Sequence, residues 1–549
     1  MGRFLNKGND GFQAVVNGEF VDKSALIEIV NATLNTERQF TCVSRARRFG
    51  KSVGAKMLYA YYDLWSASRD VFNGLSIMSS PSFDRYFRRY PVIYLDMTDF
   101  VTRYHANDIV GHIQSDVMEE VKEIFPDITY RKNADLADVL YTVASHHCME
   151  KFIMIIDEWD AVLREYKEES DVTEQYIKLL RGLFKSANAM STFAGVYMTG
   201  ILPIKKYDTQ SALNNFHEYS VVQPGPMAGC FGFTADEVYT LCEKYNMDYE
   251  SLAEWYDGYQ IGGCKRMFNP TSVMTSLYNQ YCDCYWSNTG AYDTVAAYIR
   301  MDFDGLKDDV IRLLAGESCF VDTASFQNDL NIVRSKDDVL TLLIHLGYLS
   351  YNRDSRTCKI PNREVATEFK NAIVSETGWD IIAGAIKQSE QLLKDTIEGD
   401  GDAVATALDT IHTDNTSVLK YNNENSLACV LTIAYYAAKK DYQIVRELPT
   451  GKGFADIVLL PRPNRNLPAV QHAVLRPQDL LLPRPNRNLP AVVLELKYDH
   501  TAETAINQIK GKRYTDSLLD YVGEVVLVGV NYDKESKKHQ CVIEKDTKN

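Results

Sequence analysis

The front third of the chain alternates between two hydrophobic patterns, which together predict an α/β fold. Short apolar runs, typical of buried strands, occupy residues 39–43, 91–100, 151–157 and 193–200. Residues 53–65 carry apolar side chains at helical spacing directly after the first run and its loop. Strand, loop and helix therefore follow one another in the order that a phosphate-binding loop requires.

The middle of the chain reads differently. Residues 231–298 have a helical pattern interrupted by aromatic residues, and the run WYDGY (255–259) is typical of packing and turns. Residues 337–369 predict a helix, a strand, a hairpin, a strand and a helix, which resembles a winged-helix element. Winged helices bind DNA or act as spacers, and this one lacks a basic recognition helix.

The back third predicts a second α/β region. An amphipathic helix is expected at 423–440, a hairpin at 443–460, a strand at 491–499 and a helix at 502–516. The sequence LLPRPNRNLPAV occurs twice, at 459–470 and 481–492, with an offset of 22 residues. Its Pro and Asn residues are unsuited to a central strand, so we expect a looped-out duplication that costs under ~1 kcal/mol of loop-closure entropy. A competing register would use AVQHAVL of the first copy as the strand, which leaves Glu495-Leu496-Lys497 unpaired.

The candidate phosphate loop is SRARRFGKS, residues 44–52. Gly50, Lys51 and Ser52 supply the end of a G-x-x-x-x-G-K-[ST] motif, in which the lysine contacts the β- and γ-phosphates and the hydroxyl binds Mg²⁺. Arg45 stands where the first glycine belongs, and a side chain there obstructs a turn with positive φ. A basic surface turn that caps a helix would show the same letters.

Two acidic residues end the third predicted strand. Asp157 is suited to hold Mg²⁺ and Glu158 to orient the attacking water, as phosphoryl hydrolysis requires. An Asp-Glu helix N-cap after a parallel strand is the alternative. Thr199, at the end of the fourth strand, has a plausible sensor position. The residues expected to hold ATP are Arg47, Arg48, Phe49, Gly50, Lys51, Ser52, Asp157 and Thr199.

A second cluster is predicted from strand alternation in the back third. Glu495 and Lys497 lie two residues apart and so share one face of their strand, and a strand bearing Asp456 can pair beside it. Phosphodiester hydrolysis needs such carboxylates to hold Mg²⁺ or Mn²⁺, and a lysine to orient or deprotonate water. Alternating charges on a solvated face are the alternative, but this strand is otherwise apolar.

Composition narrows the class of protein. The net charge of -15 argues against nonspecific coating of nucleic acid and leaves room for a local basic groove. Eleven cysteines without a C-x-x-C pair favour reduced thiols over disulfides or zinc sites. The start has no signal peptide pattern, and the longest apolar segment is too short to cross a bilayer. We therefore expect a soluble cytoplasmic protein.

Several motifs together resemble the bacterial AAA-ATPase-like proteins that carry a PD-(D/E)XK nuclease-like domain. The motifs are FVDKS (20–24), RARRFGKS (45–52), IIDEWD (155–160), MTG (198–200), ALNNF (212–216), WYDGY (255–259), FNPTSV (268–273) and YWSNTG (285–290). In that family the loop reads R-P-R-R-F-G-K-[ST], so Arg45 is a family trait and Ala46 is the departure. The resemblance implies a P-loop ATPase core at 1–225, a helical and winged-helix region at 226–370, and a restriction-endonuclease-like α/β domain at 371–549.

The resemblance also implies roles in the second cluster. Asp456 and Glu495 become metal ligands, Lys497 the catalytic lysine, Glu424 an accessory carboxylate and Gln508 an orienting amide. Glu447 is a further helper, and Lys510 and Tyr514 are expected near the same edge.

The leading hypothesis is an ATP-binding and ATP-hydrolysing module that governs Mg²⁺-dependent hydrolysis of nucleic acid, with DNA as the substrate and a homo-oligomer as one assembly state. The alternative is a nucleotide-responsive interaction protein whose two sites bind without turnover. Arg164 and Arg181 are arginine-finger candidates, because they follow Asp157 closely in sequence.

Overall fold

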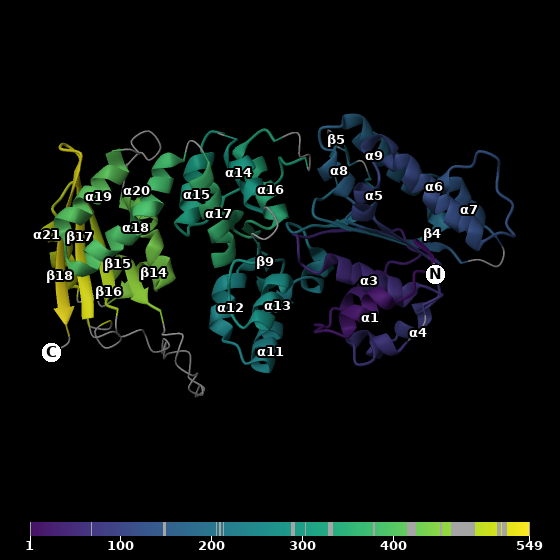
Figure 1. Ribbon diagram of the computed structural model, residues 1–549, viewed down its shortest axis with the longest axis horizontal. Coiled ribbons are helices and arrows are strands. Elements are labelled where there is room, and N and C mark those ends of the chain that lie inside the picture. The colour runs from purple at the N-terminus through teal and green to yellow at the C-terminus, as the bar shows by residue number, and fades with distance from the viewer. Residues whose placement is uncertain are drawn as a thin grey trace. The chain divides into compact units, whose positions relative to one another are not determined.

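The computed structural model describes residues 2–66, 69–146, 150–204, 206–207, 210–211, 213–286, 291–301, 303–327, 333–376, 379–413, 424–450, 453–462, 489–512, 518 and 524–547. The chain forms two compact units (Figure 1). Unit 1 comprises Met1–Ala291 and Ser318–Glu368, and unit 2 comprises Tyr292–Glu317 and Phe369–Asn549. No helix among the described residues is long and apolar enough to cross a membrane.

A five-stranded parallel sheet is the centre of unit 1. Its strand order is β2-β3-β4-β1-β7, and every neighbouring pair is parallel. The strands are β1 (Phe40–Ser44), β2 (Val92–Asp96), β3 (Phe152–Asp157), β4 (Phe193–Gly200) and β7 (His217–Tyr219). Because all five run in one direction, the residues that follow β1, β3 and β4 meet at one edge of the sheet.

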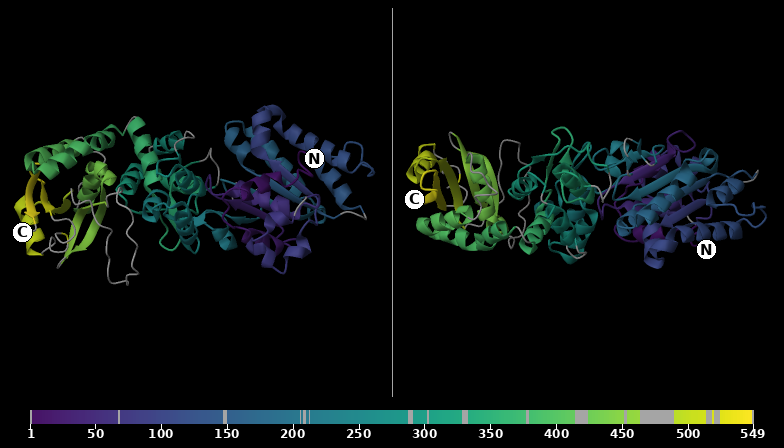
Figure 2. Two further views of the ribbon diagram at one scale, coloured as in Figure 1. Left: turned by 60° about the horizontal axis from the view of Figure 1, so that its bottom comes forward. Right: turned by 90° about the horizontal axis from the view of Figure 1, so that it is seen from above.

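Alternation along β3 explains why both faces of this sheet are covered. Phe152, Met154 and Ile156 belong to one buried cluster, and Ile153 and Ile155 belong to another. The first cluster includes side chains of α6 (Ala106–Ile124), α7 (Leu136–Ala144) and α9 (Ser170–Phe184); the second includes side chains of α2 (Ala25–Asn31) and α3 (Lys51–Tyr62). Figures 1 and 2 show the two sets of helices on opposite sides of the strands.

One strand is shorter than its apolar run predicted. Residues 91–100 were expected to form a single strand, but β2 ends at Asp96 and α5 (Met97–Arg103) follows at once. The Asp96 carboxylate accepts a hydrogen bond from the Thr98 amide at 3.0 Å. An aspartate that caps the next residues ends a strand and starts a helix, which the apolar pattern alone does not reveal.

The rest of unit 1 is helical, with three small antiparallel sheets among its described residues. Two have the orders β8-β10-β9 and β11-β13-β12, and the third pairs β5 with β6. These elements are β8 (Phe233–Thr234), β9 (Tyr259–Ile261), β10 (Cys264–Phe268), β11 (Cys319–Phe320), β12 (Ser350–Asn352), β13 (Thr357–Lys359), α11 (Ala235–Tyr245), α12 (Tyr249–Tyr256), α13 (Pro270–Asn279) and α16 (Lys336–Leu346). Helix α17 (Arg363–Ser375) begins in unit 1 and belongs to unit 2 from Phe369 onward. Shorter elements of this unit are α1 (Asp10–Val16), α4 (Phe83–Tyr86), α8 (Ala161–Glu165), α10 (Ala189–Thr192), β5 (Lys206–Tyr207) and β6 (Gln210–Ser211).

Unit 2 is a five-stranded mixed sheet with helices packed against it. Its order is β14-β15-β16-β17-β18, and only β16 and β17 run parallel. The strands are β14 (Tyr442–Thr450), β15 (Gly453–Pro461), β16 (Ala491–Tyr498), β17 (Glu524–Asp533) and β18 (Lys538–Thr547). The helices are α14 (Ala291–Ile299), α15 (Leu306–Leu314), α18 (Asp380–Glu398), α19 (Gly401–Thr413), α20 (Glu424–Ala434) and α21 (Ala502–Gly511). Helix α21 and the sheet share a buried cluster that includes Ile506, Ile509, Val493 and Leu527.

Candidate functional site

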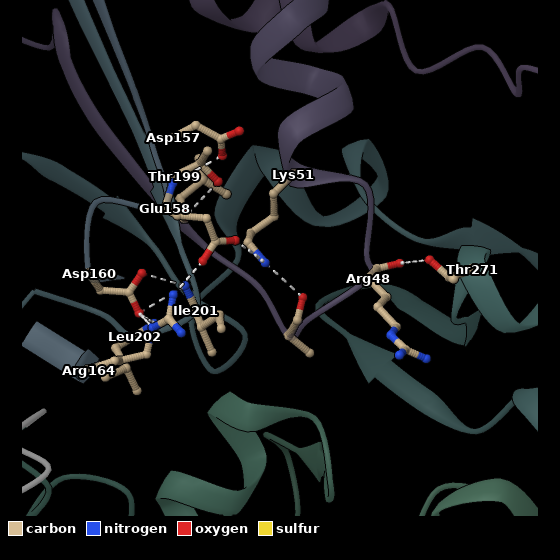
Figure 3. Close-up of polar contacts among 12 residues, drawn as sticks. Arg48, Lys51, Asp157, Glu158, Asp160, Arg164, Thr199, Ile201, Leu202 and Thr271 are labelled. Atoms are coloured by element: carbon tan, nitrogen blue, oxygen red, sulfur yellow. Dashed lines mark hydrogen bonds and ion pairs between the residues drawn. The ribbon is translucent and has the colours of Figure 1, made fainter. Parts of the chain in front are cut away.

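The loop predicted from Gly50, Lys51 and Ser52 lies between β1 and α3 (Figure 3). Gly50 has φ 86°, in the left-handed region that favours glycine, and Lys51 begins the helix. The Lys51 ammonium donates to the Ala46 carbonyl oxygen at 3.1 Å and lies 3.5 Å from Oε1 of Glu158. The start of a helix offers backbone N–H groups to an anion, so the loop and the lysine have groups that are suited to a phosphate.

The two carboxylates after β3 have different surroundings. Asp157 is buried, accepts a hydrogen bond from the Tyr94 hydroxyl at 3.0 Å and is hydrogen-bonded to the Ser52 side chain. Burial raises the pKa of Asp157 to about 6. Glu158 has φ 50° and directs one oxygen to Lys51. A left-handed backbone at a residue other than glycine is common at active sites, where the surrounding structure fixes it.

Thr199 lies on the central strand β4, between β1, which leads into the loop, and β3, which leads into the two carboxylates. In register, Thr199 stands beside Asp157 on one side and Val43 on the other. Its side chain is fully buried, and its hydroxyl donates to the Val43 carbonyl oxygen at 3.1 Å. The structure therefore brings Lys51, Asp157, Glu158 and Thr199 to one edge of the sheet (Figure 3). Ser52 follows Lys51 in the first turn of α3.

Arg45, at the position of the missing glycine, is a buried structural residue. Its guanidinium donates to the carbonyl oxygens of Ser44, Tyr219 and Met227 at 2.8 to 2.9 Å. It also lies over the Phe231 ring, and burial lowers its pKa to about 10. Arg45 therefore ties the start of the loop to residues 219–231, and its charge is directed into the protein.

The remaining loop residues differ in exposure. Arg47 is exposed, whereas Phe49 is buried and packs edge-on against Tyr259 with ring centroids 5.1 Å apart. The Arg48 guanidinium donates to the Tyr285 carbonyl oxygen at 2.8 Å. A nucleotide would thus meet Phe49 through its backbone only.

Three motifs of the family resemblance converge on this loop. Tyr259 comes from WYDGY, and Thr271, from FNPTSV, donates to the Arg48 carbonyl oxygen at 3.4 Å. Trp286, from YWSNTG, has its ring 6.0 Å from the Arg48 guanidinium. Gly347 lies so close that a Cβ there would be 2.5 Å from Cβ of Ala46. Residues of those motifs therefore pack against the loop and hold its residues 46–49 in place.

A buried glutamate, absent from the predicted site residues, organises this support. Glu364 of α17 accepts hydrogen bonds from the Tyr285 and Trp286 amides at 2.9 and 3.0 Å, and from the Ser272 hydroxyl at 2.9 Å. Burial raises the pKa of Glu364 to about 7. The sequence gives no local signal for this residue, because its partners lie about 80 or more positions earlier.

The predicted cluster of unit 2 is also brought together. Asp456 on β15 accepts a hydrogen bond from the Leu496 amide at 2.7 Å, and the Lys497 ammonium lies 3.3 Å from Oε1 of Glu495. Gln508 of α21 donates to the same oxygen of Glu495. Burial, and then the charge of Asp456, raises the pKa of Glu495 to about 7.

The other oxygen of Glu495 supplies a test of whether these residues suit a cation. Oε2 is buried and has no hydrogen-bond partner among the described residues. A buried carboxylate oxygen without a donor is costly, and a cation would satisfy it. Mg²⁺ is commonly held by one or two carboxylates and keeps several of its waters. Asp456 and Glu495 can supply the two carboxylates. Within the described residues no cluster of three or more His, Cys, Asp or Glu side chains is suited to a metal.

The accessory residues predicted for this cluster have other surroundings or are only partly described. Glu424 is the first residue of α20, and its side chain lies outside the described part of the chain. Glu447 is exposed and lies between Arg446 and Leu448, which pair with the two neighbours of Asp456. Lys510 pairs with Glu544, and Tyr514 is outside the described residues.

The duplicated segment leaves the strand pairing intact. β15 ends at Pro461, in the first copy, and β16 begins at Ala491, in the second. The two strands pair directly, with Ile457 opposite Leu494. Most of the duplication, residues 463–488, including AVQHAVL, lies outside the described part of the chain. The strand that pairs with β15 is therefore the one that carries Glu495 and Lys497.

Residues 8–210 match a family model described as "Predicted AAA-ATPase". This part of the chain is therefore similar to an AAA-ATPase-like domain. The match spans β1 to β5 and thus the loop, Asp157, Glu158 and Thr199. No curated protein matches the chain.

Solved structures similar to the chain include Cdc6p from Pyrobaculum aerophilum, with 10% identity, 67% of this chain, 98% of that chain and a TM-score of 0.25. The ORC2 protein of Aeropyrum pernix has 10% identity, 66% and 98% coverage and a TM-score of 0.27. AMPPCP-bound DnaA from Aquifex aeolicus has 8% identity, 77% and 97% coverage and a TM-score of 0.24. These TM-scores are low, so nothing about this chain is inferred from those structures.

Proposed function

We propose that unit 1 binds and hydrolyses ATP at the loop of residues 45–52. Lys51 would leave the Ala46 carbonyl and contact the β- and γ-phosphates, and Ser52 and Asp157 would hold Mg²⁺, which neutralises charge on the phosphates. Glu158 would orient the attacking water. The observation that carries this proposal is the 3.5 Å approach of Lys51 to Glu158 beside the Ser52–Asp157 pair, at the edge of a parallel sheet.

Two substitutions test this proposal. Lys51→Ala removes the phosphate contact and is expected to abolish binding of a fluorescent ATP analogue, whereas Glu158→Gln keeps binding and lowers hydrolysis by about 10²–10⁴-fold. Arg103→Ala, which breaks a surface ion pair with Asp99 on α5, is a control for loss of a basic side chain away from the loop. Binding that survives Lys51→Ala unchanged would refute the loop assignment.

We also propose that unit 2 hydrolyses phosphodiester bonds of nucleic acid, with DNA as the substrate, in a Mg²⁺- or Mn²⁺-dependent reaction. Asp456 and Glu495 would hold the cation, which supplies an activated water, and Lys497 would orient that water. Gln508 would fix Glu495. The observation that carries this proposal is Oε2 of Glu495, which is buried beside Asp456, Lys497 and Gln508 and has no hydrogen-bond partner in the described part of the chain.

Incubation of the purified protein with plasmid DNA and Mg²⁺ tests this activity. Cleavage is expected in the wild type and should vanish in Glu495→Ala and Lys497→Ala, while Lys394→Ala, which breaks a surface ion pair with Glu398 on α18, should cleave normally. Equal cleavage by all four proteins would identify a contaminant. Comparing reactions with and without ATP shows whether unit 1 governs unit 2.

The alternative function, a nucleotide-responsive interaction protein, would give a different set of results. Its sites would bind ATP and Mg²⁺ without turnover, so the Lys51→Ala and Glu495→Ala variants would lose binding and no protein would cleave DNA. The buried, structural Arg45 is the observation that favours this alternative, because it replaces the glycine that usually opens a phosphate loop.

A further inference from the structure

An alternating chain of charges runs behind the candidate ATP site. Lys51 approaches Oε1 of Glu158 at 3.5 Å, and the Arg164 guanidinium donates to the opposite oxygen, Oε2, at 2.7 Å. The Nε of Arg164 donates to Asp160 at 3.0 Å. Figure 3 shows that Arg164 reaches Glu158 from the side away from Lys51. The two oxygens of Glu158 are therefore engaged by two different cations.

Asp160 fixes the position of Arg164. Its side chain is fully buried and accepts hydrogen bonds from the Ile201 and Leu202 amides at 3.0 to 3.3 Å. A Cβ at Gly200 would lie 2.4 Å from an oxygen of Asp160, so the carboxylate occupies space that only glycine leaves open. Asp160 is thus anchored to the backbone immediately after β4.

Nucleotide would change only one side of this arrangement. The phosphates would compete for Lys51, because an ammonium pairs with phosphate as a point charge. Arg164 would stay in place, because Asp160 and its backbone partners do not depend on nucleotide. A planar guanidinium that binds a carboxylate at fixed geometry restricts that carboxylate more than a lysine does.

We infer that Arg164 is a positioning residue for Glu158. It holds Oε2, so that Oε1 stays directed to the place that Lys51 vacates and where the attacking water would sit. This inference rests on the proposed ATP hydrolysis, and it assigns Arg164 a role within its own chain in place of the arginine-finger role. A misplacement of about 1 Å in a catalytic group can lower a rate about 10²-fold.

Steady-state ATP hydrolysis by the full chain tests this role. Arg164→Ala is expected to lower kcat about 10- to 100-fold and to leave KM for ATP within about two-fold, because the lost contact orients the base and does not bind phosphate. Arg164→Lys keeps the charge but cannot hold Glu158 and Asp160 together, so an intermediate kcat is expected. Arg103→Ala, which breaks the same i,i+4 type of pair, should match the wild type.

A double mutant separates positioning from general support of the fold. In the Glu158→Gln background, Arg164→Ala should lower kcat by less than about two-fold, since its effect passes through the carboxylate already removed. Full additivity of the two losses, or a rise in KM at constant kcat, would overturn the inference. If Arg164→Ala does not fold, Arg164→Lys in the same two backgrounds gives the same comparison. Absence of hydrolysis in the wild type would instead refute the proposed function.

Discussion

Two buried glutamates, one in each unit, look alike in burial and differ in what completes them. Glu364 and Glu495 are 0% and 1% exposed, and burial raises the pKa of each to about 7. Glu364 is surrounded by donors, since Ser272 and the Tyr285 and Trp286 amides bind its carboxylate. Oε2 of Glu495 has no partner among the described residues.

The difference separates a structural carboxylate from one suited to a ligand. Burying a carboxylate is costly, and neutral donors such as those around Glu364 offset that cost within the protein. Glu495 instead contacts Lys497 and Gln508 through one oxygen, and the nearby charge of Asp456 opposes its ionisation. A divalent cation bound by both carboxylates would offset the repulsion between Asp456 and Glu495, and it would also give Oε2 a partner.

The largest expected effect is the loss of Glu364. Glu364→Ala leaves two buried amides and one hydroxyl without an acceptor and opens a cavity behind the phosphate loop. Each unsatisfied donor costs about 1–3 kcal/mol, so we expect unit 1 to lose about 4 kcal/mol of unfolding free energy. Glu364→Gln keeps an acceptor oxygen and is the matched control. Hydrogen exchange at the Tyr285 and Trp286 amides measures the effect, and equal exchange in both variants would refute the structural role.

The next effect is stabilisation of unit 2 by cation. Mg²⁺ at about 100 times its dissociation constant should stabilise the wild type by about 2.7 kcal/mol, because it binds only the folded arrangement of Asp456 and Glu495. Glu495→Gln should show no such shift, and Lys394→Ala should show the full shift. The measurement is the thermal unfolding midpoint with Mg²⁺, with Mn²⁺ and with EDTA. A Glu495→Gln variant that responds as the wild type does would place the cation elsewhere.

Local patterns in the sequence predicted the parts of both sites that depend on neighbouring positions. The apolar runs located β1, β3 and β4, and alternation placed Glu495 and Lys497 on one face, as their 3.3 Å contact confirms. The strand of Asp456 pairs with that of Glu495, an arrangement that the sequence allowed but did not by itself require. Arg164 was within reach of sequence reasoning too, because it lies four residues after Asp160 and so on the same helical face.

Long-range partners limited the rest. Arg45 looked like a basic loop residue because the carbonyls that bind it, at Tyr219 and Met227, are more than 170 positions away. The motif WYDGY gave no hint that Tyr259 packs on Phe49 of the loop. A strand's end can also depend on one side chain, since Asp96 stops β2 inside an apolar run. Such features come from tertiary contacts, which override local preference.

The last effect is a pH dependence that Glu364 alone contributes. Its pKa is raised from 4.5 to about 7 in the folded chain, so the folded state retains a proton that the unfolded state has lost. The resulting stability is fully present below pH 4.5, falls as pH rises towards 7 and is gone above it. Glu364→Gln cannot titrate and lacks this contribution.

The unfolding free energy of the wild type, relative to Glu364→Gln, should therefore fall by about 3 kcal/mol across that window and stay level above it. Glu495 titrates in both proteins and cancels from the difference. Denaturant unfolding of unit 1, monitored by Trp fluorescence at pH values from about 4 to about 9, measures this difference in free energy. If the difference in unfolding free energy rose with pH, Glu364 would be ionised in the folded protein. Its hydrogen-bond donors would then stabilise a carboxylate anion and not a neutral carboxyl group.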